Sequence, residues 1–166
     1  MCKINFKKTL PYIGSILFMI ILSYIYFSPD ILEGKVLFQG DTQQGIAIGQ
    51  EGKAFREATG ETTRWTNSLF SGMPNFQISP SYANNYWMGQ IGRIYHLGLQ
   101  SPASLVFIMM LGFFILLSAM KIRWYLALVG AIAYAFSSYF FIIIGAGHIW
   151  KFITLAYIPP TIAGII

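Results

Sequence analysis

Residues 9–27 read TLPYIGSILFMIILSYIYF, an apolar run without a single charged side chain. At about 1.5 Å per residue, a helix over this run is close to 30 Å long, the thickness of one hydrocarbon layer. A cleaved signal peptide has a shorter apolar core and ends in a site of small residues. This run ends instead in aromatic residues followed by Ser28-Pro29. Residues 9–27 are therefore predicted to form an uncleaved membrane-spanning helix.

The composition extends this prediction to the rest of the chain. Of its 166 residues, 55% are hydrophobic and only 10% are charged, and the mean hydropathy is +0.58. A soluble domain carries about 25% charged residues. Because so few charges cannot cover a surface in water, lipid is expected to be part of the surroundings. The predicted fold is all-α: a polytopic transmembrane helical protein with a partly helical outer loop.

The placement of charge predicts the orientation of the chain. The net charge is +5, with Lys3, Lys7 and Lys8 before the first apolar run and Lys121 and Arg123 between two later runs. All six acidic residues fall in one stretch after the first run. Basic residues mark the cytoplasmic ends of membrane helices, so the N-terminus is predicted to be cytoplasmic. They form no single basic face, which argues against nucleic-acid binding.

The same pattern divides the whole chain into segments. The last apolar segment, residues 152–166, is too short to cross a bilayer, so we expect this sequence to be the N-terminal fragment of a longer protein. The predicted order is a cytoplasmic N-terminus (1–8), a transmembrane helix (9–27), an outer loop (28–101), a second transmembrane helix (102–120), a cytoplasmic turn (121–123), a third transmembrane helix (124–144), an outer turn (145–151) and the start of a fourth membrane segment (152–166).

The outer loop contains two stretches with helical signals. Asp41 to Gln44 has the form of a capping box, which predicts a helix starting at Asp41 and ending before Gly60. Residues 82–99 carry apolar side chains at helical spacing and predict a helix that lies in the membrane interface. The residues expected on its apolar face are Trp87, Ile91, Ile94 and Tyr95.

Two further patterns concern the later helices. Ser101-Pro102 resembles a helix start, with Ser101 as the N-cap and proline in the first turn. Ala127, Ala131 and Ala135 recur every four residues, a spacing at which small side chains let helices pack closely in lipid. These alanines are expected to contact a neighbouring helix.

The sequence contains no Walker loop, HExxH, CxxC or GxSxG motif. The groups that could carry chemistry gather on the predicted outer side. Three stretches there resemble the YfhO-like membrane proteins, which belong to the GT-C class of polytopic glycosyltransferases. They are Gln39-Gly-Asp41-Thr-Gln-Gln44, then Trp65-x-Asn67 leading to Gly72-Met73-Pro74, and finally Gly147-His148 with Pro159 beyond it.

This resemblance implies a function and a location. GT-C enzymes take a sugar from a polyprenyl-phosphate carrier at the outer face of the membrane, here the bacterial cytoplasmic (inner) membrane. The implied partners are the bilayer, the lipid-linked sugar and a cell-envelope glycan or polymer acceptor. An essential acidic residue often lies in the first outer loop, and Asp41 matches that position. Its neighbours Gly40 and Thr42 give no paired acidic motif, so no metal ligand is assigned and a divalent metal stays open.

The chemistry of glycosyl transfer suits these residues. A base must take the proton of the acceptor hydroxyl, and a carboxylate such as Asp41 can do so. Cations would stabilise the departing lipid phosphate. The candidates for substrate binding are Arg64, Trp65, Asn67, Gly72, Met73, Pro74, Arg93, His148 and Lys151.

Each candidate also has a purely structural explanation. Asp41 could only cap a helix, and residues 65–74 could form a tight turn with an interfacial tryptophan. His148 could lie at a helix end near water, and Lys151 could extend to the lipid headgroups. Arg93 could bind headgroups.

Two other functions remain open. One is a transporter or lipid-carrier flippase, which would place ionisable or broken-helix sites near the bilayer midplane. The predicted spans contain no charged residue, which counts against it. The other is a non-catalytic scaffold subunit whose outer loop binds a partner.

Overall fold

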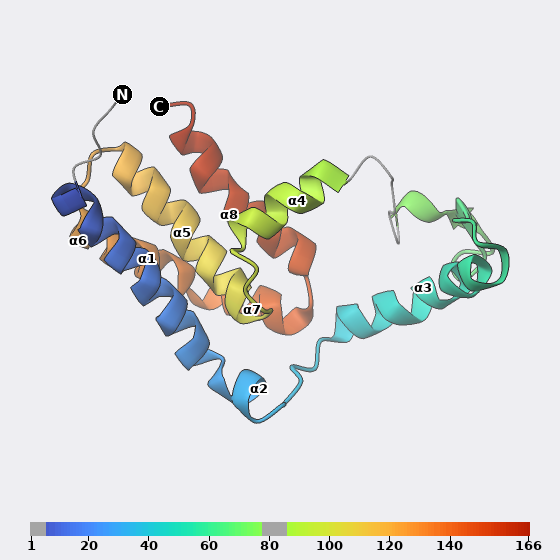
Figure 1. Cartoon of the computed structure of the whole chain (residues 1–166). Coiled ribbons are helices and arrows are strands. Elements are labelled where there is room, and N and C mark those ends of the chain that lie inside the picture. The colour runs from blue at the N-terminus through green and yellow to red at the C-terminus, as the bar shows by residue number, and fades with distance from the viewer. Residues whose placement is uncertain (1–5, 78–85) are drawn as a thin grey trace.

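The computed structural model describes residues 6–77 and 86–166, and most of them are helical (Figure 1). The predicted all-α class is confirmed at this level, with one small hairpin added. The elements are α1 (Phe6–Tyr26), α2 (Ser28–Leu32), α3 (Gly40–Thr59), β1 (Trp65–Thr66), β2 (Met73–Pro74), a 3-10 helix (Asn75–Gln77), α4 (Tyr86–Tyr95), α5 (Ala103–Ala119), α6 (Trp124–Ala135), α7 (Ser138–Ala146) and α8 (Ile149–Ala163).

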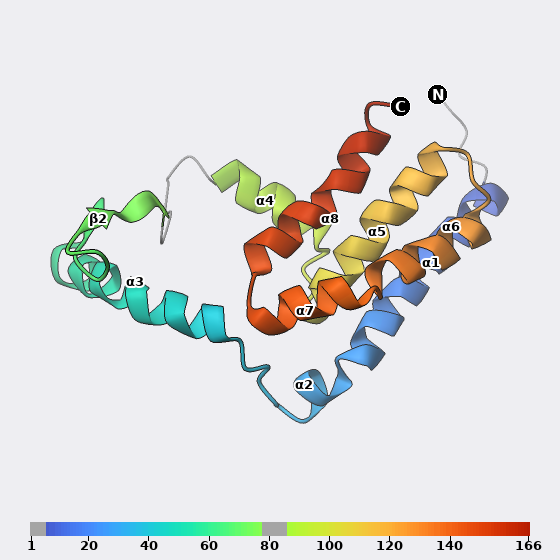
Figure 2. The same cartoon turned by 180° about the vertical axis from the view of Figure 1, so that it is seen from behind.

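Helix α5 is the centre of a bundle formed with α1, α6 and α8 (Figures 1 and 2). Residues 103–110 are buried without interruption, so this half of the helix is covered on every side. A helix that is apolar all round has to be covered in this way, by protein or by lipid. The sequence of α5, which has no polar face, explains its central position.

On α1, two serines and Met19 point into the bundle, and several large aliphatic side chains point out of it. Ser15 and Ser23 of α1 are buried, and each hydroxyl donates to the carbonyl oxygen four residues earlier, at 2.9 Å. Leu17 and Ile25 on the same helix are 54% and 64% exposed. This arrangement is the reverse of that expected for a helix surrounded by water.

Helix α6 packs on α5 through its small residues, as the sequence predicted. Ala127, Ala131 and Ala135 are completely buried. A Cβ atom built on Gly130 would lie only 2.7 Å from Cδ1 of Leu117 on α5. The predicted contact between the alanine face and a neighbouring helix is confirmed.

The third predicted span is not one continuous helix. The sequence predicted a single helix over residues 124–144, but the structure has α6 and α7, bent by 46° at the break between them. Phe136 ends α6, and Ser137 precedes α7 with extended backbone angles. The apolar run continues through the break without proline or glycine, which is why hydropathy alone did not reveal it.

Only some of the helices predicted to cross the membrane are long and apolar enough to do so. Among the described residues, α1 is long and apolar enough to cross a bilayer, and the bent pair α6–α7 adds a second span if it counts as one. Helix α5 is apolar but has 17 residues, about 25 Å of helix. It begins at Ala103 with Pro102 at the N-cap and no side-chain capping bond, so the predicted cap by Ser101 is wrong.

Different elements lie at the two ends of the bundle. The start of α1 and the turn between α5 and α6 lie at one end (Figures 1 and 2). Helix α2, the start of α5 and the α7–α8 turn lie toward the other end, from which α3 extends away. Helix α8 starts at Ile149, earlier than the sequence predicted, because the turn after α7 needs only Gly147 and His148.

Helix α4 lies against α5 and α8 through Tyr95. The Tyr95 hydroxyl donates to the carbonyl oxygen of Ile108 at 3.2 Å, and its ring packs 4.8 Å from that of Tyr157. Burial raises the pKa of the Tyr95 phenol. The rest of the predicted apolar face is open, since Trp87 and Ile94 are 73% and 72% exposed. The predicted helix was longer, and its part over 82–85 lies outside the described residues.

Candidate functional site

The candidate site is an ion pair between two residues that are far apart in the sequence. Nδ1 of His148 lies 2.9 Å from Oδ2 of Asp41. Both side chains are about half exposed, at 51% and 49%, so solvent or a substrate can reach them. The structure thus brings together the predicted base and one of the predicted phosphate-binding residues.

Three backbone and side-chain contacts hold the start of α3 against the α7–α8 turn. Nε2 of Gln39 donates to the carbonyl oxygen of Ile144 at 2.7 Å, and the Thr42 hydroxyl donates to Oε1 of Gln39 at 3.0 Å. Gly147 closes the contact from the other side, because a Cβ atom there would lie 2.9 Å from Oγ1 of Thr42. Gly147 also has a φ of +94°, which L side chains rarely adopt. These contacts position Asp41 beside His148.

The predicted capping role of Asp41 is wrong. Helix α3 begins at Gly40 with Gln39 at the N-cap, and no side chain makes the capping bond. Asp41 lies inside the first turn, and its carboxylate pairs with His148 instead. The end of α3 is as predicted: Gly60 is left-handed, and its N–H donates to the carbonyl oxygen of Arg56 at 2.8 Å.

Two helix N-termini meet at the ion pair. Asp41 belongs to the first turn of α3, and His148 immediately precedes α8. The N-terminal end of a helix carries a partial positive charge and favours anions. Lys151 adds a formal charge in the first turn of α8, where its Nζ lies 5.7 Å from the centre of the Tyr139 ring. The two helix N-termini therefore favour the ionised form of the Asp41 carboxylate, and Lys151 adds positive charge at the start of α8.

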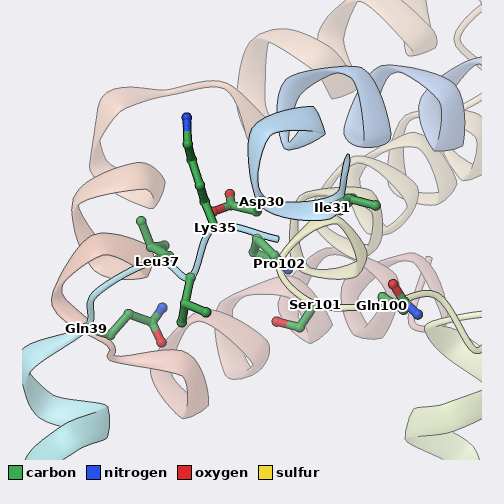
Figure 3. A pocket seen from close by; sticks show the side chains of 9 residues that line it. Asp30, Ile31, Lys35, Leu37, Gln39, Gln100, Ser101 and Pro102 are labelled. Atoms are coloured by element: carbon green, nitrogen blue, oxygen red, sulfur yellow. The ribbon is translucent and has the colours of Figure 1, made fainter. Parts of the chain in front are cut away.

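A polar pocket of about 310 Å³ reaches Gln39, the residue at the N-cap of α3 (Figure 3). It is formed by α2, the segment leading to α3 and the residues just before α5. Gln39 belongs both to this pocket and to the contacts that hold α3 in place. The residues that line the pocket are Asp30, Ile31, Lys35, Val36, Leu37, Gln39, Gln100, Ser101 and Pro102.

The predicted stretch from Trp65 to Pro74 lies elsewhere. It forms the hairpin of β1 and β2, with Trp65 opposite Pro74, near the far end of α3 (Figure 1). A Cβ atom on Gly72 would lie 2.8 Å from Nε1 of Trp65, so the indole covers Gly72 and only glycine fits beneath it. Asp41 is about ten residues before the hairpin contacts on α3, or some 15 Å along the helix axis. The structure does not unite this hairpin with Asp41.

Glu51 attaches the hairpin to α3, a role that the sequence did not predict. Its Oε2 accepts hydrogen bonds from the Thr66 hydroxyl at 2.5 Å, from the Ser68 hydroxyl at 2.9 Å and from the Asn67 N–H at 2.8 Å. These donors, led by Thr66, hold the pKa of Glu51 at about 2, below its usual 4.5. The only available signal was a run of short polar residues, which is common in turns.

The remaining candidates do not join the ion pair. Asn67 also donates through Nδ2 to Glu51, so its side chain has a structural partner. The carbonyl oxygen of Arg64 accepts a hydrogen bond from the N–H of Asn75 at 2.8 Å, beside the β1–β2 hairpin. The Arg64 side chain is exposed. Met73 is opposite Thr66 in the same hairpin. Arg93 lies on α4, also exposed.

In the described part of the chain, no three His, Cys, Asp or Glu side chains converge on a point where they could hold a metal ion. Comparison with protein-family models, curated proteins and solved structures finds no match for this chain. The case for a function therefore depends on the site itself.

Proposed function

We propose that this chain belongs to a multi-pass membrane glycosyltransferase of the YfhO-like, GT-C type. It would move a sugar from polyprenyl phosphate to an outer-surface glycan, polymer or lipid. The N-terminus would be cytoplasmic, with α1, α5, the bent pair α6–α7 and α8 in the bilayer. The inverted polarity of α1, with serines inside and aliphatic side chains outside, supports this placement.

One observation carries the proposal: the 2.9 Å pair of Asp41 and His148 at the end of the bundle opposite the basic turn. A carboxylate fixed at a helix N-terminus, half exposed and two residues after Gln39 of the polar pocket, is positioned to act on a substrate at the membrane surface. A lipid-linked donor also explains why the catalytic group lies beside apolar helices, since such a substrate stays in the bilayer.

The reaction is a single displacement. Asp41 takes the proton from the acceptor hydroxyl as that oxygen forms a bond to the anomeric carbon of the sugar. The bond between this carbon and the phosphate oxygen breaks, and polyprenyl phosphate leaves with the electron pair. His148 holds Asp41 in one orientation, and Lys151 with the N-terminus of α8 stabilises the departing phosphate.

The test uses the protein that contains this chain, purified into lipid nanodiscs. A panel of radiolabelled polyprenyl-phosphate hexoses serves as donors, and release of label from the lipid is measured. Asp41→Asn should lower the rate by at least about 100-fold, the size of a general-base contribution. Glu57→Gln, an exposed change on the same helix, should have the wild-type rate. Wild-type turnover by Asp41→Asn would remove Asp41 as the base.

A transporter or flippase is the second candidate, because α6 and α7 form a broken helix near the middle of an apolar run. Broken helices at that depth are common in transporters. The same nanodisc experiment separates the two functions, because a transporter or flippase leaves the bond between sugar and phosphate intact. Movement of labelled lipid between leaflets without release of sugar would favour this candidate.

A further inference from the structure

The outer module formed by α3 and the β1–β2 hairpin has little to pack against. Helix α3 has 20 residues, about 30 Å of helix, and none of them is buried. It is fixed to the bundle at its start through Gln39 and to the hairpin through Glu51. A helix without a buried face gains little stability from packing. A further surface under the far end of the module would supply the missing support.

The tip of the hairpin is strained. Phe70 and Ser71 have φ angles of +52° and +60°, and Gly72 follows at +122°. A positive φ is an outlier for a bulky residue and persists only where the surrounding structure enforces it. Two contacts enforce it here: the Gly72 N–H donates to the carbonyl oxygen of Leu69 at 2.9 Å, and the Trp65 indole covers Gly72. Such strain is concentrated at functional positions, which points to a function for this tip.

The strained tip presents an aromatic side chain to the outside. Phe70 is 86% exposed, and Trp65 and Phe76 on the same module are 53% and 54% exposed. Tryptophan and phenylalanine are typical of protein surfaces that enter the boundary between lipid headgroups and acyl chains. The module therefore carries the side chains of a membrane-contact surface.

The direction of α3 suits such a contact. The chain turns at α2, and α3 then leads off to the side of the bundle instead of continuing the direction of α1 (Figures 1 and 2). With the bundle in the bilayer as proposed, the end of α1 marks the lipid surface. The hairpin at the far end of α3 is then beside the bundle, where the bilayer surrounds it.

We infer that the hairpin tip is a peripheral membrane anchor, with Phe70 inserted into the outer leaflet beside the bundle. The inference rests on the proposed membrane placement and not on the transfer reaction. Residues 51–77 carry three acidic and three basic side chains, so their charges balance. The anchor therefore depends on burial of apolar surface and works on an uncharged lipid surface. It supports α3 at the end opposite its contact with the bundle.

Spin labelling in phosphatidylcholine nanodiscs tests the anchor on the whole protein that contains this chain. With native cysteines replaced by serine, a nitroxide on Ser71→Cys reports on the exposed tip while Phe70 stays in place. Its collisions with oxygen, which concentrates in lipid, should be frequent. Its collisions with a water-soluble nickel chelate should be several-fold rarer than those of a nitroxide on Glu61→Cys. Glu61 is a charged, exposed residue beyond the end of α3, so its label should stay in water.

Phe70→Ser in the Ser71→Cys protein is the decisive variant. Because Phe70 is 86% exposed, its replacement leaves the hydrogen bonds of the hairpin in place. Collisions of the Ser71→Cys label with the nickel chelate should then rise to the level at Glu61→Cys. Val36→Ser is the matched control, since it removes an apolar side chain that is 88% exposed but lies before α3. It should leave the tip label shielded.

Three results would overturn the anchor. The first is a Ser71→Cys label as open to the nickel chelate as the Glu61→Cys label. The second is a label shielded from both reagents, because protein and not lipid would then cover the tip. The third is shielding that Phe70→Ser leaves unchanged.

A label on the exposed face of α1 separates the anchor from the proposed placement and function. A nitroxide on Leu17→Cys, a position that is 54% exposed, should collide often with oxygen if the bundle is in lipid. A lipid-exposed Leu17→Cys label with a water-exposed Ser71→Cys label would remove the anchor alone. A water-exposed Leu17→Cys label would remove the membrane placement and the anchor with it. Sugar transfer enters none of these measurements, so a failed transfer assay leaves the anchor standing.

Discussion

At the scale of single residues, the Asp41–His148 pair should matter far more to turnover than to stability. Both side chains are about half exposed, and ion pairs in that setting contribute at most about 1 kcal/mol. We expect Asp41→Asn to lower the free energy of unfolding by less than this amount while sugar transfer is lost. Unfolding in mixed micelles and transfer in nanodiscs measure the two effects on the same protein.

A substitution of His148 tests which member of the pair takes the proton from the acceptor hydroxyl. Gln at this position keeps an N–H that can hold Asp41 but cannot accept a proton in catalysis. If Asp41 is the base, His148→Gln should keep transfer within roughly tenfold of the wild type. A loss as large as that of Asp41→Asn would assign the base to His148 and contradict the mechanism above.

Gly147 offers a matched pair of substitutions. We expect Gly147→Ala to displace Thr42 and the start of α3, because the added methyl group would lie 2.9 Å from the Thr42 hydroxyl at a φ of +94°. Transfer should fall about tenfold or more, since a displacement near 1 Å can cost about 100-fold. Gly145→Ala is the control, since a Cβ atom there has nothing within 4 Å. Equal rates for the two variants would show that this contact does not position Asp41.

The residues of the site differ in how far the sequence could predict them. Charge placement put Asp41 and His148 on the same predicted side, and the structure brings them into contact. The contact itself depends on the direction in which α3 leaves α2, which no local pattern encodes. Gln39 has a common residue type and no motif of its own, so its part in both the pocket and the α3 contact could only come from the fold.

At the scale of elements, the attachment of the hairpin to α3 should depend on pH through Glu51. Its folded pKa of about 2 is below the ordinary 4.5, so the ionised carboxylate favours the attached hairpin. This stabilisation is complete above about 4.5 and is lost as the pH falls toward about 2. The amide resonances of Asn67 and Ser68 should titrate near 2. A midpoint near 4.5 would contradict the hydrogen-bonded geometry, and Glu51→Gln should abolish the transition.

The packing of α5 against α8 should be sensitive to one methyl group. A Cβ atom on Gly112 would lie 2.7 Å from the carbonyl oxygen of Ala156 and 2.8 Å from the Tyr95 hydroxyl. Because a backbone carbonyl cannot easily move away, we expect Gly112→Ala to destabilise the bundle by about 1–3 kcal/mol.

Thermal unfolding in detergent micelles measures this effect, with Gly14→Ala on α1 as the control. A Cβ atom on Gly14 has nothing within 4 Å, so the control should be neutral or slightly stabilising. Unchanged stability for Gly112→Ala would mean that α5 and α8 are less closely packed than described.

Helix positions were easier to predict than helix breaks. The first apolar run and the alanine face of α6 follow directly from hydropathy and spacing, and both agree with the structure. The bend between α6 and α7 has only a weak signal, the pair Ser137-Ser138, because no proline or glycine interrupts the run there. The capping box at Asp41 failed because a carboxylate near a helix start has two competing partners, and here His148 is the one it contacts.

At the scale of the whole molecule, the bundle is apolar on its outer surface as well as in its core. The interior of the bundle holds large apolar side chains together with alanines and a few serines, and leucine, isoleucine and valine also cover its outer surface. In water this arrangement would expose a large apolar surface, which soluble proteins avoid. In lipid it costs nothing, and close packing of small residues holds the helices together. The proposed placement in the membrane therefore explains the architecture as well as the composition.

This placement predicts which segments face the outside. The chain has one cysteine, Cys2, so Cys2→Ser, with any cysteine elsewhere in the protein also replaced by serine, gives the background for Glu61→Cys near the hairpin and Lys121→Cys in the α5–α6 turn. Both positions are exposed. Because short connections rich in lysine and arginine, such as the α5–α6 turn, stay on the cytoplasmic side, a membrane-impermeant maleimide applied to intact cells should label only the Glu61→Cys protein. Lys121→Cys should react after permeabilisation.

Each other outcome of this labelling has a definite structural meaning. Labelling of Lys121→Cys alone would invert the orientation and place Asp41 in the cytosol, away from the proposed lipid-linked donor. Labelling of both in intact cells would mean that α5 does not cross the bilayer. Because α5 is the buried central helix, that outcome would contradict the proposed placement of the whole bundle in the membrane. Since Asp41 lies in the first turn of α3 and Glu61 follows the end of that helix, the side that Glu61→Cys reports is also the side on which the proposed base works.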